Sequence, residues 1–578
     1  MNGPKLRVLQ IDLTERRVGV LPADGLEHYL GGIGLAAKLF AGLVDVQAAP
    51  LDAHQPVVLA GGALAAFFPM CTKGVAVFRS PLTGGWGESY AGMRLALALR
   101  LAGWDAIVIT GRADRPVYLS IGPHGVRFKS AAALWGLDCE EAGRLLRQLE
   151  PGRGFRSCLR IGPAGEKGVA FASVNVDTYR HFGRLGLGAV LGAKNLKAIV
   201  IYGDRDYPVP QPKQYREIYD QIYRQAVRTD VMEKYHALGT SVNVSVLSEL
   251  GALPTRNLQQ STFEAAERIS GRAFAEGSLV RKVACAGCPV GCIHIGLRRR
   301  QFAPGYEYES VALSYDHELI YALGSLLGMS SPEKVYDLIE AVELYGLDAI
   351  SAGVLLAWLT EAQQNGLLRE EDLGCWLEFD RVEGYLKVLE NLVEQPSELY
   401  ALLAQGLARA VERLGGKEYA LCLGGHEMAG YHTGPANLLG LAVGARHSHL
   451  DNAGYAIDQK ASKNGWDSAR MVHEIMAEEK WRNVLNCLCI CLFAREVYTP
   501  AVVQKALAAV GIERTGEELM ALGEEIFQLK NRLRSQLGYS SERLYFAPRY
   551  FATPALGRQI DPAQLQEMLE LYRQQAGV

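Results

Sequence analysis

Three cysteines on one short loop constrain this chain more than any other feature of its sequence. The stretch "ACAGCPVGC", residues 284–292, places Cys285, Cys288 and Cys292 at the spacing C-x2-C-x3-C. Structural zinc prefers two pairs of ligands, whereas an iron–sulfur cubane commonly takes several cysteines from one loop and one from far away. The spacing therefore favours a [4Fe–4S] cluster, with zinc, or no metal at all, as the alternatives.

A second cysteine-rich stretch offers the distant ligand. "NCLCICLF" contains Cys487, Cys489 and Cys491, which alternate along the chain. In an extended segment all three would point to one side, so periodicity does not choose among them. The total of eleven cysteines is odd and no secretion signal precedes them, which argues against a disulfide framework. We expect most of the scattered cysteines to be buried small hydrophobic residues: Cys71, Cys139, Cys158, Cys375 and Cys422.

Size and charge narrow the class of protein. A chain of 578 residues is too long for one hydrophobic core, so several domains are expected. The net charge of −3 does not indicate binding to nucleic acid or to an anionic membrane. The start, "MNGPKLRVLQIDLTERR", lacks the apolar block of a signal peptide. "QPVVLAGGALAAFFPM" is too short and too rich in glycine to span a bilayer. We predict a cytoplasmic protein.

The pattern of the sequence changes near residue 208 from one that predicts strands to one that predicts helices. Before it, short β-branched runs such as "QPVVLAG" and "KAIVIYG" are bounded by Gly, Pro or Asp and predict strands. A proline-rich linker at 208–212 is followed by amphipathic runs that predict helices. One of these, "SPEKVYDLIEAVELYG", begins with a capping Ser331 and a proline in the first turn.

Two glycine-rich stretches imitate a dinucleotide-binding fingerprint. "GGIGLAA" begins at Gly31 without a convincing strand before it, and in "GRLGLGAVLGAKNLKAIVIYG" the strand follows the glycines. A Rossmann turn requires the strand first and the helix second, so a nicotinamide site is not predicted. The glycines indicate tight turns or a close backbone approach to another phosphate-bearing ligand.

Nine stretches stand in the order in which one known family has them. They are "LRVLQIDLTERRV", "YLGGIGLAAKL", "FRSPLTGGWGES", "LAGWDAIVITGRADRPVYLSI", "IGPAGEKGVAFASV", "FGRLGLGAVLGAKNLKAIVI", "CAGCPVGC", "YEYESVALS" and "ELYGLDAIS". On these stretches the chain resembles the tungsten-containing aldehyde:ferredoxin oxidoreductase family. The resemblance covers nearly the whole chain.

The resemblance implies an α+β fold in three domains. A β-rich pterin-binding base domain is expected over residues 1–207. Two mainly α-helical domains follow, residues 208–415 with the three-cysteine loop and residues 416–578 with the fourth cysteine. In the family the loop and one late cysteine hold a [4Fe–4S] cluster, which implies Cys285, Cys288, Cys292 and Cys491 as its ligands here.

The resemblance also implies a second cofactor, tungsten or molybdenum held by the dithiolenes of two pyranopterins, with Mg²⁺ bridging the pterin phosphates. The late cysteine of the family lies in a D-x-x-G-L-C segment that contacts a pterin. Here Asn486 takes the place of the Asp and Cys489 that of the Gly, so this contact is altered. The expected cofactor-binding residues are Lys73, Gly92, Arg184, Glu343, Gly346, Asp348, Asn486 and Ile490, and Tyr90 stands where the family often has Asn.

For acid–base chemistry the resemblance points to one carboxylate and one histidine. Glu309 in "YEYES" matches a glutamate near the metal, although by itself it reads equally as a helix-surface residue. The family histidine follows an Arg by four residues, which lands on Leu450, one place beyond His449. His449 is the first candidate, and His447 and His432 are the others; two histidines beside an Asp also suit a non-haem metal site or a polar network.

The expected activity is oxidation of an aldehyde to a carboxylic acid. Electrons would pass to ferredoxin or to a separate iron–sulfur subunit, because one cluster alone needs a partner. A homodimer or a hetero-oligomer is compatible with this. The alternatives are a low-potential acyl-CoA reductase-like member of the same family and a catalytically silent iron–sulfur or zinc scaffold. Some members bind a metal through E-x-x-H at a dimer interface; Asp337 and Glu340 occupy these places here, so that metal is not predicted.

Overall fold

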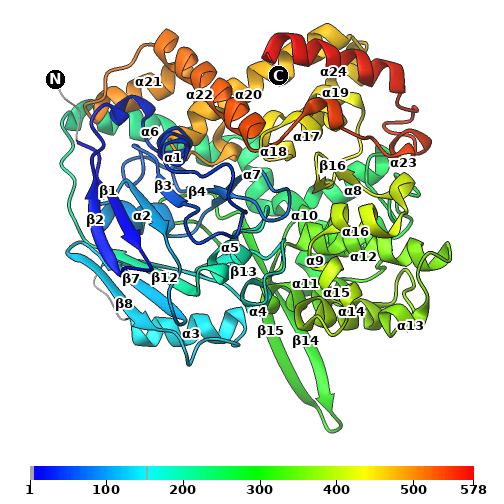
Figure 1. Cartoon of the computed structure of the whole chain (residues 1–578). Helices are drawn as coiled ribbons and strands as arrows, with labels where there is room; N and C mark the ends of the chain where they lie inside the picture. The colour runs from blue at the N-terminus through cyan, green and yellow to red at the C-terminus, as the bar shows by residue number, and fades with distance from the viewer. Residues whose placement is uncertain (1–4, 151–153, 578) are drawn as a thin grey trace.

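Two six-stranded sheets form the N-terminal part of the molecule (Figure 1). The computed structural model describes residues 5–150 and 154–577, and all the predicted site residues fall within these ranges. The first sheet has the order β2-β1-β6-β3-β4-β5 and the second the order β11-β10-β9-β12-β7-β8. The strands are β1 (Val8–Asp12), β2 (Arg17–Leu21), β3 (Val57–Gly61), β4 (Gly74–Arg79), β5 (Trp86–Ala91), β6 (Ala106–Thr110), β7 (Val117–Gly122), β8 (Gly125–Ser130), β9 (Phe155–Arg160), β10 (Val174–Val176), β11 (Arg180–Phe182) and β12 (Leu196–Gly203).

A shared hydrophobic core joins the two sheets. Leu9 and Ile107 of the first sheet and Leu119 and Ile199 of the second belong to it, together with Leu99 from α2. β3 is buried along its whole length and β12 along nearly all of it, as central strands are. The β-rich N-terminal prediction is confirmed. The short helices of this part are α1 (Gly32–Ala41), α2 (Leu95–Leu101), α3 (Cys139–Leu149), α4 (Pro163–Glu166) and α5 (Leu187–Ala193).

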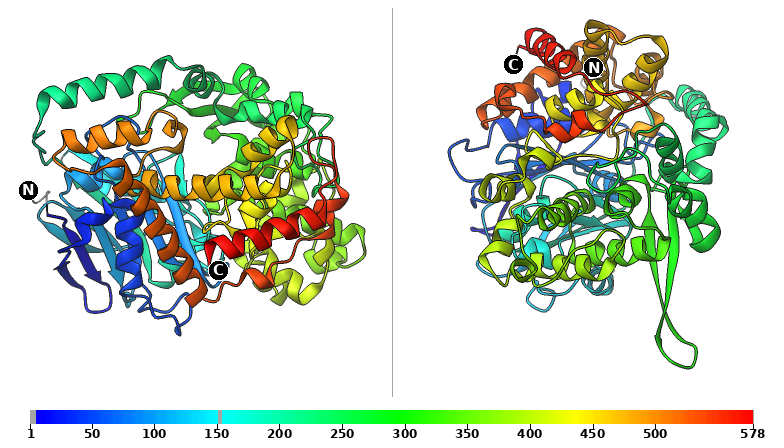
Figure 2. Two further views of the ribbon diagram at one scale, coloured as in Figure 1. Left: turned by 90° about the horizontal axis from the view of Figure 1, so that it is seen from above. Right: turned by 90° about the vertical axis from the view of Figure 1, so that its right-hand side faces the viewer.

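The rest of the chain is mostly helical, again as predicted (Figure 2). In α11 Pro332 occupies the first turn and Ser331 the N-cap position, although the serine side chain makes no capping hydrogen bond. The helices are α6 (Pro212–Arg228), α7 (Asp230–Ala237), α8 (Asn243–Glu249), α9 (Gly271–Ser278), α10 (His317–Leu323), α11 (Pro332–Tyr345), α12 (Ala349–Gln364), α13 (Glu370–Leu373), α14 (Val382–Glu394), α15 (Glu398–Leu403), α16 (Leu407–Leu414), α17 (Pro435–Val443), α18 (His449–Asn452), α19 (Gly454–Asn464), α20 (Ser468–Cys487), α21 (Pro500–Ala509), α22 (Gly516–Gln536), α23 (Pro548–Ala552) and α24 (Pro562–Ala576).

The C-terminal helices return to the first sheet. Val484 on α20 and Ile526 on α22 share one hydrophobic core with Phe40 on α1 and with Val58 and Val108 of the sheet. This packing brings the segment after α20, which carries the late cysteines, against the N-terminal part of the chain. A two-stranded hairpin, β16 (Cys422–Leu423) with β17 (His426–Glu427), connects α16 to α17.

A three-stranded sheet interrupts the helical part and was not predicted. It contains β13 (Leu279–Val283), β14 (Ile293–Ala303) and β15 (Glu307–Tyr315). The β14–β15 hairpin, called the arm from here on, projects from the body of the molecule in both side views (Figures 1 and 2). Its outer half has little burial, so its sequence lacks the apolar alternation by which a half-buried strand is recognised.

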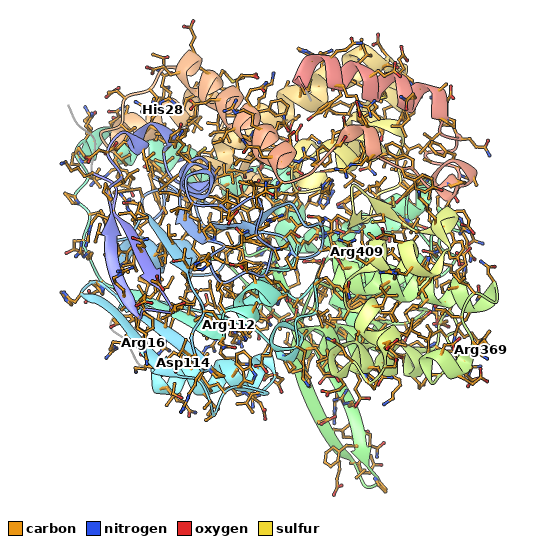
Figure 3. All side chains as sticks on the ribbon, viewed as in Figure 1. Arg16, His28, Arg112, Asp114, Arg369 and Arg409 are labelled. Atoms are coloured by element: carbon orange, nitrogen blue, oxygen red, sulfur yellow. The ribbon has the colours of Figure 1, made fainter. Side chains whose placement is uncertain are left out.

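Charged side chains such as Arg16, Arg112 and Arg369 lie on the outside of the molecule (Figure 3). Within residues 5–150 and 154–577, no helix combines the length and the apolar character that crossing a bilayer requires. The division expected at residues 207 and 415 stays a prediction.

Candidate functional site

Backbone hydrogen bonds hold the three-cysteine loop and the late cysteine segment to one stretch of chain. Met70 N donates to Gly287 O at 3.1 Å, and Cys491 N donates to Met70 O at 2.9 Å. Lys73 N donates to Cys489 O at 3.0 Å. Residues 284–292 and 486–491 are therefore attached to the same turn before β4, although about two hundred residues separate them in sequence.

A second connection fixes the first cysteine. Ala286 N donates to Met93 O at 2.9 Å, and Met93 N donates to Cys285 Sγ at 3.2 Å. A Cβ at Gly92 would lie only 2.6 Å from the Cys285 sulfur and 3.3 Å from Lys73 Nζ. Glycine at this position lets the chain approach the thiol closely.

The electrostatics of the thiols suit a bound cation. Burial, reinforced by the nearby Cys491, raises the pKa of Cys288 to about 12. Burial raises the pKa of Cys292 to about 11 against the opposing effect of Arg180. Burial alone would lower the pKa of Lys73, but the thiols of Cys491 and Cys285 raise it above its ordinary value. Because metals bind thiolates, a cation that displaces these protons fits the set.

Among the three late cysteines, the structure brings Cys491 to the loop. The Cys487 sulfur packs against Gly34, where an added Cβ would lie 3.1 Å away, and the Cys489 sulfur faces Asn486 O at 3.6 Å. The segment is not extended as the alternation argument assumed, because Cys487 is the last residue of α20. In the described ranges no three Cys, His, Asp or Glu side chains stand ready for a single metal ion.

Arg184 and Asp348, both expected at the second cofactor, lie together. Arg184 Nε approaches Asp348 Oδ2 at 3.4 Å, and Arg184 Nη2 donates to Glu427 O at 2.5 Å. The Ser351 hydroxyl bridges Asp348 Oδ2 and Glu427 Oε2, at 2.7 Å from each. Arg184 Nη1 is buried and has no hydrogen-bond partner in the described ranges. This guanidinium therefore has an unused donor beside two carboxylates.

Glu343 and Gly346 lie on the chain segment that leads to Asp348. His181 Nε2 lies 2.8 Å from Glu343 Oε2, and Asn175 Nδ2 donates to the same oxygen at 3.4 Å. Gly346 ends α11 with φ 74°, a conformation that glycine adopts without strain, and the turn places Asp348 at the start of α12. Asn175 Oδ1 is buried without a partner in the part of the chain described.

Asn486 and Ile490 are buried where the late segment crosses α1 and β3. A Cβ at Gly32 would lie 2.2 Å from Asn486 O, so the two backbones touch. Cys489, in the place of the family glycine, has φ 53°. That left-handed conformation is one that glycine adopts freely and cysteine adopts at a cost of about 1–3 kcal/mol. The turn therefore keeps its shape although the residue has changed.

Glu309 does not lie where it was predicted. It sits on the outer half of the arm opposite Arg300, to which it is ion-paired, with 45% of its side chain exposed. Arg300 is the eighth residue after Cys292, which corresponds to about 26 Å along a strand at the usual rise. The prediction that a short return brings Glu309 to the redox centres is wrong, because β14 and β15 carry it outward. It is a surface residue of a strand.

A different carboxylate, Glu318, follows the inner end of β15. It lies in the first turn of α10, behind the capping residue Asp316, which accepts from Leu319 N at 3.2 Å. Glu318 Oε1 is 3.5 Å from Nδ1 of His449, and Glu318 Oε2 accepts from Gly430 N at 3.1 Å. Sequence reasoning missed Glu318; the only signal was an aspartate cap at the end of a strand.

Burial tunes both members of this pair. It raises the pKa of Glu318 to about 7, and it lowers the pKa of His449 well below its usual value, with His317 and Arg184 adding to the effect. The Glu318 side chain is nevertheless 24% exposed and that of His449 12%. The two facing atoms, Glu318 Oε1 and His449 Nδ1, are buried and have no hydrogen-bond partner among the described residues. We call Glu318, His449, Arg184, Asp348 and Glu427 the inner site.

Arg180 connects the inner site with the thiols. Its Nη1 lies 3.8 Å from Asp316 Oδ2. Burial alone would lower the pKa of Arg180, but Asp316, Cys292 and Cys285 raise it. One cation therefore lies between the cap of α10 and the three-cysteine loop.

The other two candidate histidines have structural contacts. His447 Nδ1 lies 3.0 Å from Leu441 O, and burial together with Arg534 lowers its pKa to about 3. His432 Nε2 lies 2.9 Å from Thr553 O, and burial lowers its pKa to about 4. A carbonyl oxygen only accepts, so each of these ring nitrogens donates.

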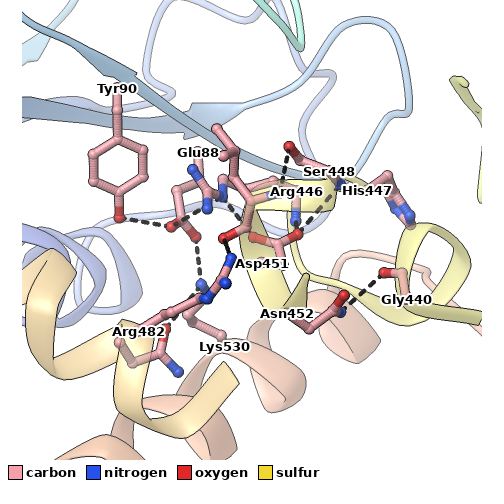
Figure 4. A network of polar contacts seen from close by, with 12 residues as sticks. Glu88, Tyr90, Gly440, Arg446, His447, Ser448, Asp451, Asn452, Arg482 and Lys530 are labelled. Atoms are coloured by element: carbon pink, nitrogen blue, oxygen red, sulfur yellow. Dashed lines mark hydrogen bonds and ion pairs between the residues drawn. The ribbon is translucent and has the colours of Figure 1, made fainter. Parts of the chain in front are cut away.

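A buried ion network stands beside His447 and joins three parts of the chain (Figure 4). Lys530 Nζ on α22 lies 2.7 Å from Glu88 Oε2 on β5, and Arg446 Nε lies 2.6 Å from Asp451 Oδ1. Glu88 Oε1 accepts from Tyr90 Oη at 2.8 Å and lies 3.8 Å from Arg446 Nε. Tyr90, in the place of the family asparagine, is thus part of this network.

Asp337 and Glu340, which stand where some family members have E-x-x-H, form ion pairs with arginines of the arm. Asp337 accepts from Arg298 Nε at 2.8 Å, and Glu340 accepts from Arg300 Nη1 at 2.8 Å. Both carboxylates therefore have cationic partners from the same chain.

With this geometry in place, comparisons define first the class and then the family. The fold matches a solved structure, the active-site complex BamBC of benzoyl coenzyme A reductase with 1,5-dienoyl-CoA, at a TM-score of 0.83 and 20% identity, covering 99% of this chain and 94% of that one. The architecture is therefore the α+β fold of that complex. The model of the aldehyde ferredoxin oxidoreductase N-terminal domain matches residues 8–203, and the model of its domains 2 and 3 matches residues 217–578.

Relatives extend over the same length. A tungsten-containing aldehyde ferredoxin oxidoreductase of Pyrococcus abyssi is 32% identical over 92% of this chain and 89% of its own. That of Thermococcus kodakarensis is 29% identical over 99% and 96%. An aliphatic sulfonate oxidoreductase, WOR-like subunit, of Pyrococcus furiosus is 28% identical over 94% and 87%. The chain belongs to the aldehyde ferredoxin oxidoreductase family.

Proposed function

We propose that the protein is a tungsten–bispterin, iron–sulfur oxidoreductase that converts an aldehyde and water into a carboxylic acid, two electrons and two protons. The observation that carries the proposal is the buried Glu318–His449 pair. It lies next to Asp316, whose partner Arg180 also lies near the thiols of Cys292, Cys285 and Cys491. Cys285, Cys288, Cys292 and Cys491 would hold a [4Fe–4S] cluster, which would supply one-electron transfer to a ferredoxin or a separate iron–sulfur subunit in the cytoplasm.

The unsatisfied polar atoms fit a bispterin group. Arg184 Nη1, Arg446 Nη2 and Asn175 Oδ1 are buried without partners in the described residues. Guanidinium groups suit phosphates, and amide and carboxylate groups suit the ring nitrogens of a pterin. Arg184, Asp348 and Glu343 would hold the group on one side, and the 486–490 segment would hold it on the other. When bound, the metal supplies the two-electron chemistry and polarises the carbonyl.

The chain's own residues manage the protons. A carboxyl group with a pKa near 7 is matched to proton transfer at neutral pH. Glu318 in its ionised form takes a proton from the water that attacks the carbonyl carbon. His449, kept neutral by burial, lies 3.5 Å from Glu318 Oε1 and makes no hydrogen bond to it among the described residues, so it adds no positive charge beside that carboxylate. Lys73 and Arg180 supply positive charge beside the thiolates and so favour electron acceptance there.

Metal analysis tests this proposal. Protein purified from cells supplied with tungsten and molybdenum should contain about one tungsten and about four irons per chain, and it should reduce a viologen dye with an aldehyde. Iron without tungsten or molybdenum would contradict the proposal that the protein is an enzyme of this kind. Zinc alone would favour the scaffold alternative.

A further inference from the structure

A cavity of about 490 Å³ lies where three parts of the chain meet. The turn between β4 and β5 borders it on one side, α16 and the β16–β17 hairpin on another, and the end of α22 with the segment to Tyr545 on the third. None of the predicted cofactor residues lines it. His447, which the proposed chemistry does not use, does line it.

The lining is cationic. Arg534, Lys417 and Arg543 face the cavity, and Glu412 is its single acidic residue. Glu412 is already paired with Arg409 at 3.3 Å, on α16 (Arg409 is labelled in Figure 3). In the described ranges none of the three cations has a carboxylate within 4.0 Å. An anion is therefore missing from their surroundings.

Arg534 is the strongest sign of a ligand. It is only 3% exposed, and its Nη1 donates to Val443 O at 2.7 Å. Its guanidinium stacks on the ring of Tyr539 at 3.8 Å, which fixes its direction. Its Nη2 is buried and has no hydrogen-bond partner among the described residues. A buried guanidinium with an unused donor is costly unless something pairs with it.

The cavity also borders the inner site. The Gly424–Gly425 turn lines it, and the next residues are His426 and Glu427. Glu427 O accepts from Arg184 at 2.5 Å, and the His447 and His426 rings lie 6.3 Å apart. The Gly424–Gly425 turn therefore separates the cavity from the inner site by only a few residues of chain.

We propose that this cavity admits the substrate and that Arg534, with Lys417 at the mouth, binds an acid group at the substrate's far end. The proposal rests on the function proposed above and names its substrate class, an aldehyde carrying a second, anionic group. Lys417 stacks on Tyr545 at 3.9 Å, which holds its ammonium at the entrance. The anion is a carboxylate or a phosphate carried by the aldehyde; either presents an oxygen that can accept from the unused Nη2 of Arg534.

Matched aldehydes test the proposal. On the tungsten-loaded holoenzyme, kcat/KM should favour succinate semialdehyde over butanal and adipate semialdehyde over hexanal by about tenfold to a hundredfold in at least one pair, because a charge-assisted hydrogen bond is gained. Arg534→Gln should remove this preference and Lys417→Met should reduce it, while kcat/KM for the neutral aldehyde stays unchanged. Arg369→Gln, an exposed arginine elsewhere, is the control.

Two results would overturn the proposal. One is equal use of charged and neutral aldehydes by the wild type, and the other is a preference that both Arg534→Gln and Lys417→Met retain. Lys417 is exposed, so its replacement keeps the test valid if Arg534→Gln does not fold.

If no aldehyde is oxidised, the proposed function fails, and calorimetry decides the cavity claim separately. Binding of adipate that both variants weaken about tenfold supports a carboxylate site, and the same pattern with coenzyme A supports a phosphate site. No binding of either, or binding that the variants leave unchanged, contradicts the claim.

Discussion

Two glutamates nine residues apart, Glu309 and Glu318, show how differently one segment of chain can treat the same side chain. Glu309 lies on the outer half of the arm, 45% exposed and paired with Arg300. Glu318 lies at the inner site, where burial raises its pKa to about 7 and His449 is its neighbour. The chemical capacity of a carboxyl group follows from its surroundings, and a matching short motif does not supply them.

The same contrast holds for ion pairs. Arg300 and Glu309 are both more than one third exposed, whereas Lys530 and Glu88 are 6% and 0% exposed at their side chains. Exposed pairs contribute little because water and salt screen them. Removing one partner of a buried pair leaves an uncompensated charge in the interior. The arm and the interior should therefore respond to mutation by very different amounts.

The largest effect is expected at the thiols. Cys491→Ala should abolish the reduced-state EPR signal of the cluster and, with it, electron delivery to any acceptor. Cys487→Ala is the matched control, because its sulfur packs against Gly34 and away from the loop, and its signal should persist. A signal lost in Cys487→Ala but kept in Cys491→Ala would move the fourth ligand.

Next comes the buried ion network. Lys530→Met should lower the free energy of unfolding by about 3–5 kcal/mol, because Glu88 would remain buried opposite a thioether. Chemical denaturation of the holoprotein measures this. The double variant Lys530→Met with Glu88→Gln should regain part of the loss, and a single variant as stable as wild type would refute the network's structural role.

A smaller change should follow at the histidines. His449→Asn should reduce kcat by about 10²-fold, the low end for a positioned proton-transfer group, with tungsten and iron contents unchanged. His447→Asn should cost less, since His447 contacts Leu441 O and borders the cavity rather than Glu318. Equal losses in both variants would remove the distinction between them.

The smallest effect belongs to the arm. Glu309→Gln should change the free energy of unfolding by less than about 1 kcal/mol and should leave kcat unaltered, because the Arg300–Glu309 pair is exposed at both side chains. Arg300 keeps its contact at 2.8 Å with Glu340, whose side chain is only 11% exposed. A loss of activity in this variant would mean that the arm reaches the inner site through a route not described above.

Sequence reasoning succeeded where covalent geometry or burial leaves a local pattern. The β-branched runs that became β3, β6 and β12 and the amphipathic run that became α11 are of this kind. The cysteine loop is also a local pattern, because ligand spacing is written in consecutive residues. The structure brings Cys491 to that loop, and its role as a cluster ligand stays a prediction. The arm escaped because its strands pair only with each other and with β13, so no core imposes a pattern on them.

The pairing of Glu318 with His449 could not be found in the same way, although His449 itself was a candidate. Glu318 and His449 come from α10 and α18, and nothing in either local sequence records that they meet. The raised pKa of Glu318 arises from burial by elements distant in sequence. The "YEYES" stretch lies close to Glu318 in the sequence, but β15 carries its Glu309 to the far end of a hairpin.

A side-by-side pH profile of Glu318→Gln and Glu309→Gln tests the central claim most directly. An ionised Glu318 is the base, so kcat/KM of the wild type should rise with pH through about 7 and fall below it. The groups facing Glu318 that also carry charge or titrate are His449, Asp316, Arg184 and Asp348, and all are retained in both variants. Glu318→Gln should lose about 10²–10⁴-fold in kcat together with this acid limb, at unchanged tungsten and iron contents, while Glu309→Gln should match the wild type. An intact acid limb and near-normal turnover in Glu318→Gln, with the loss appearing in Glu309→Gln, would contradict the account.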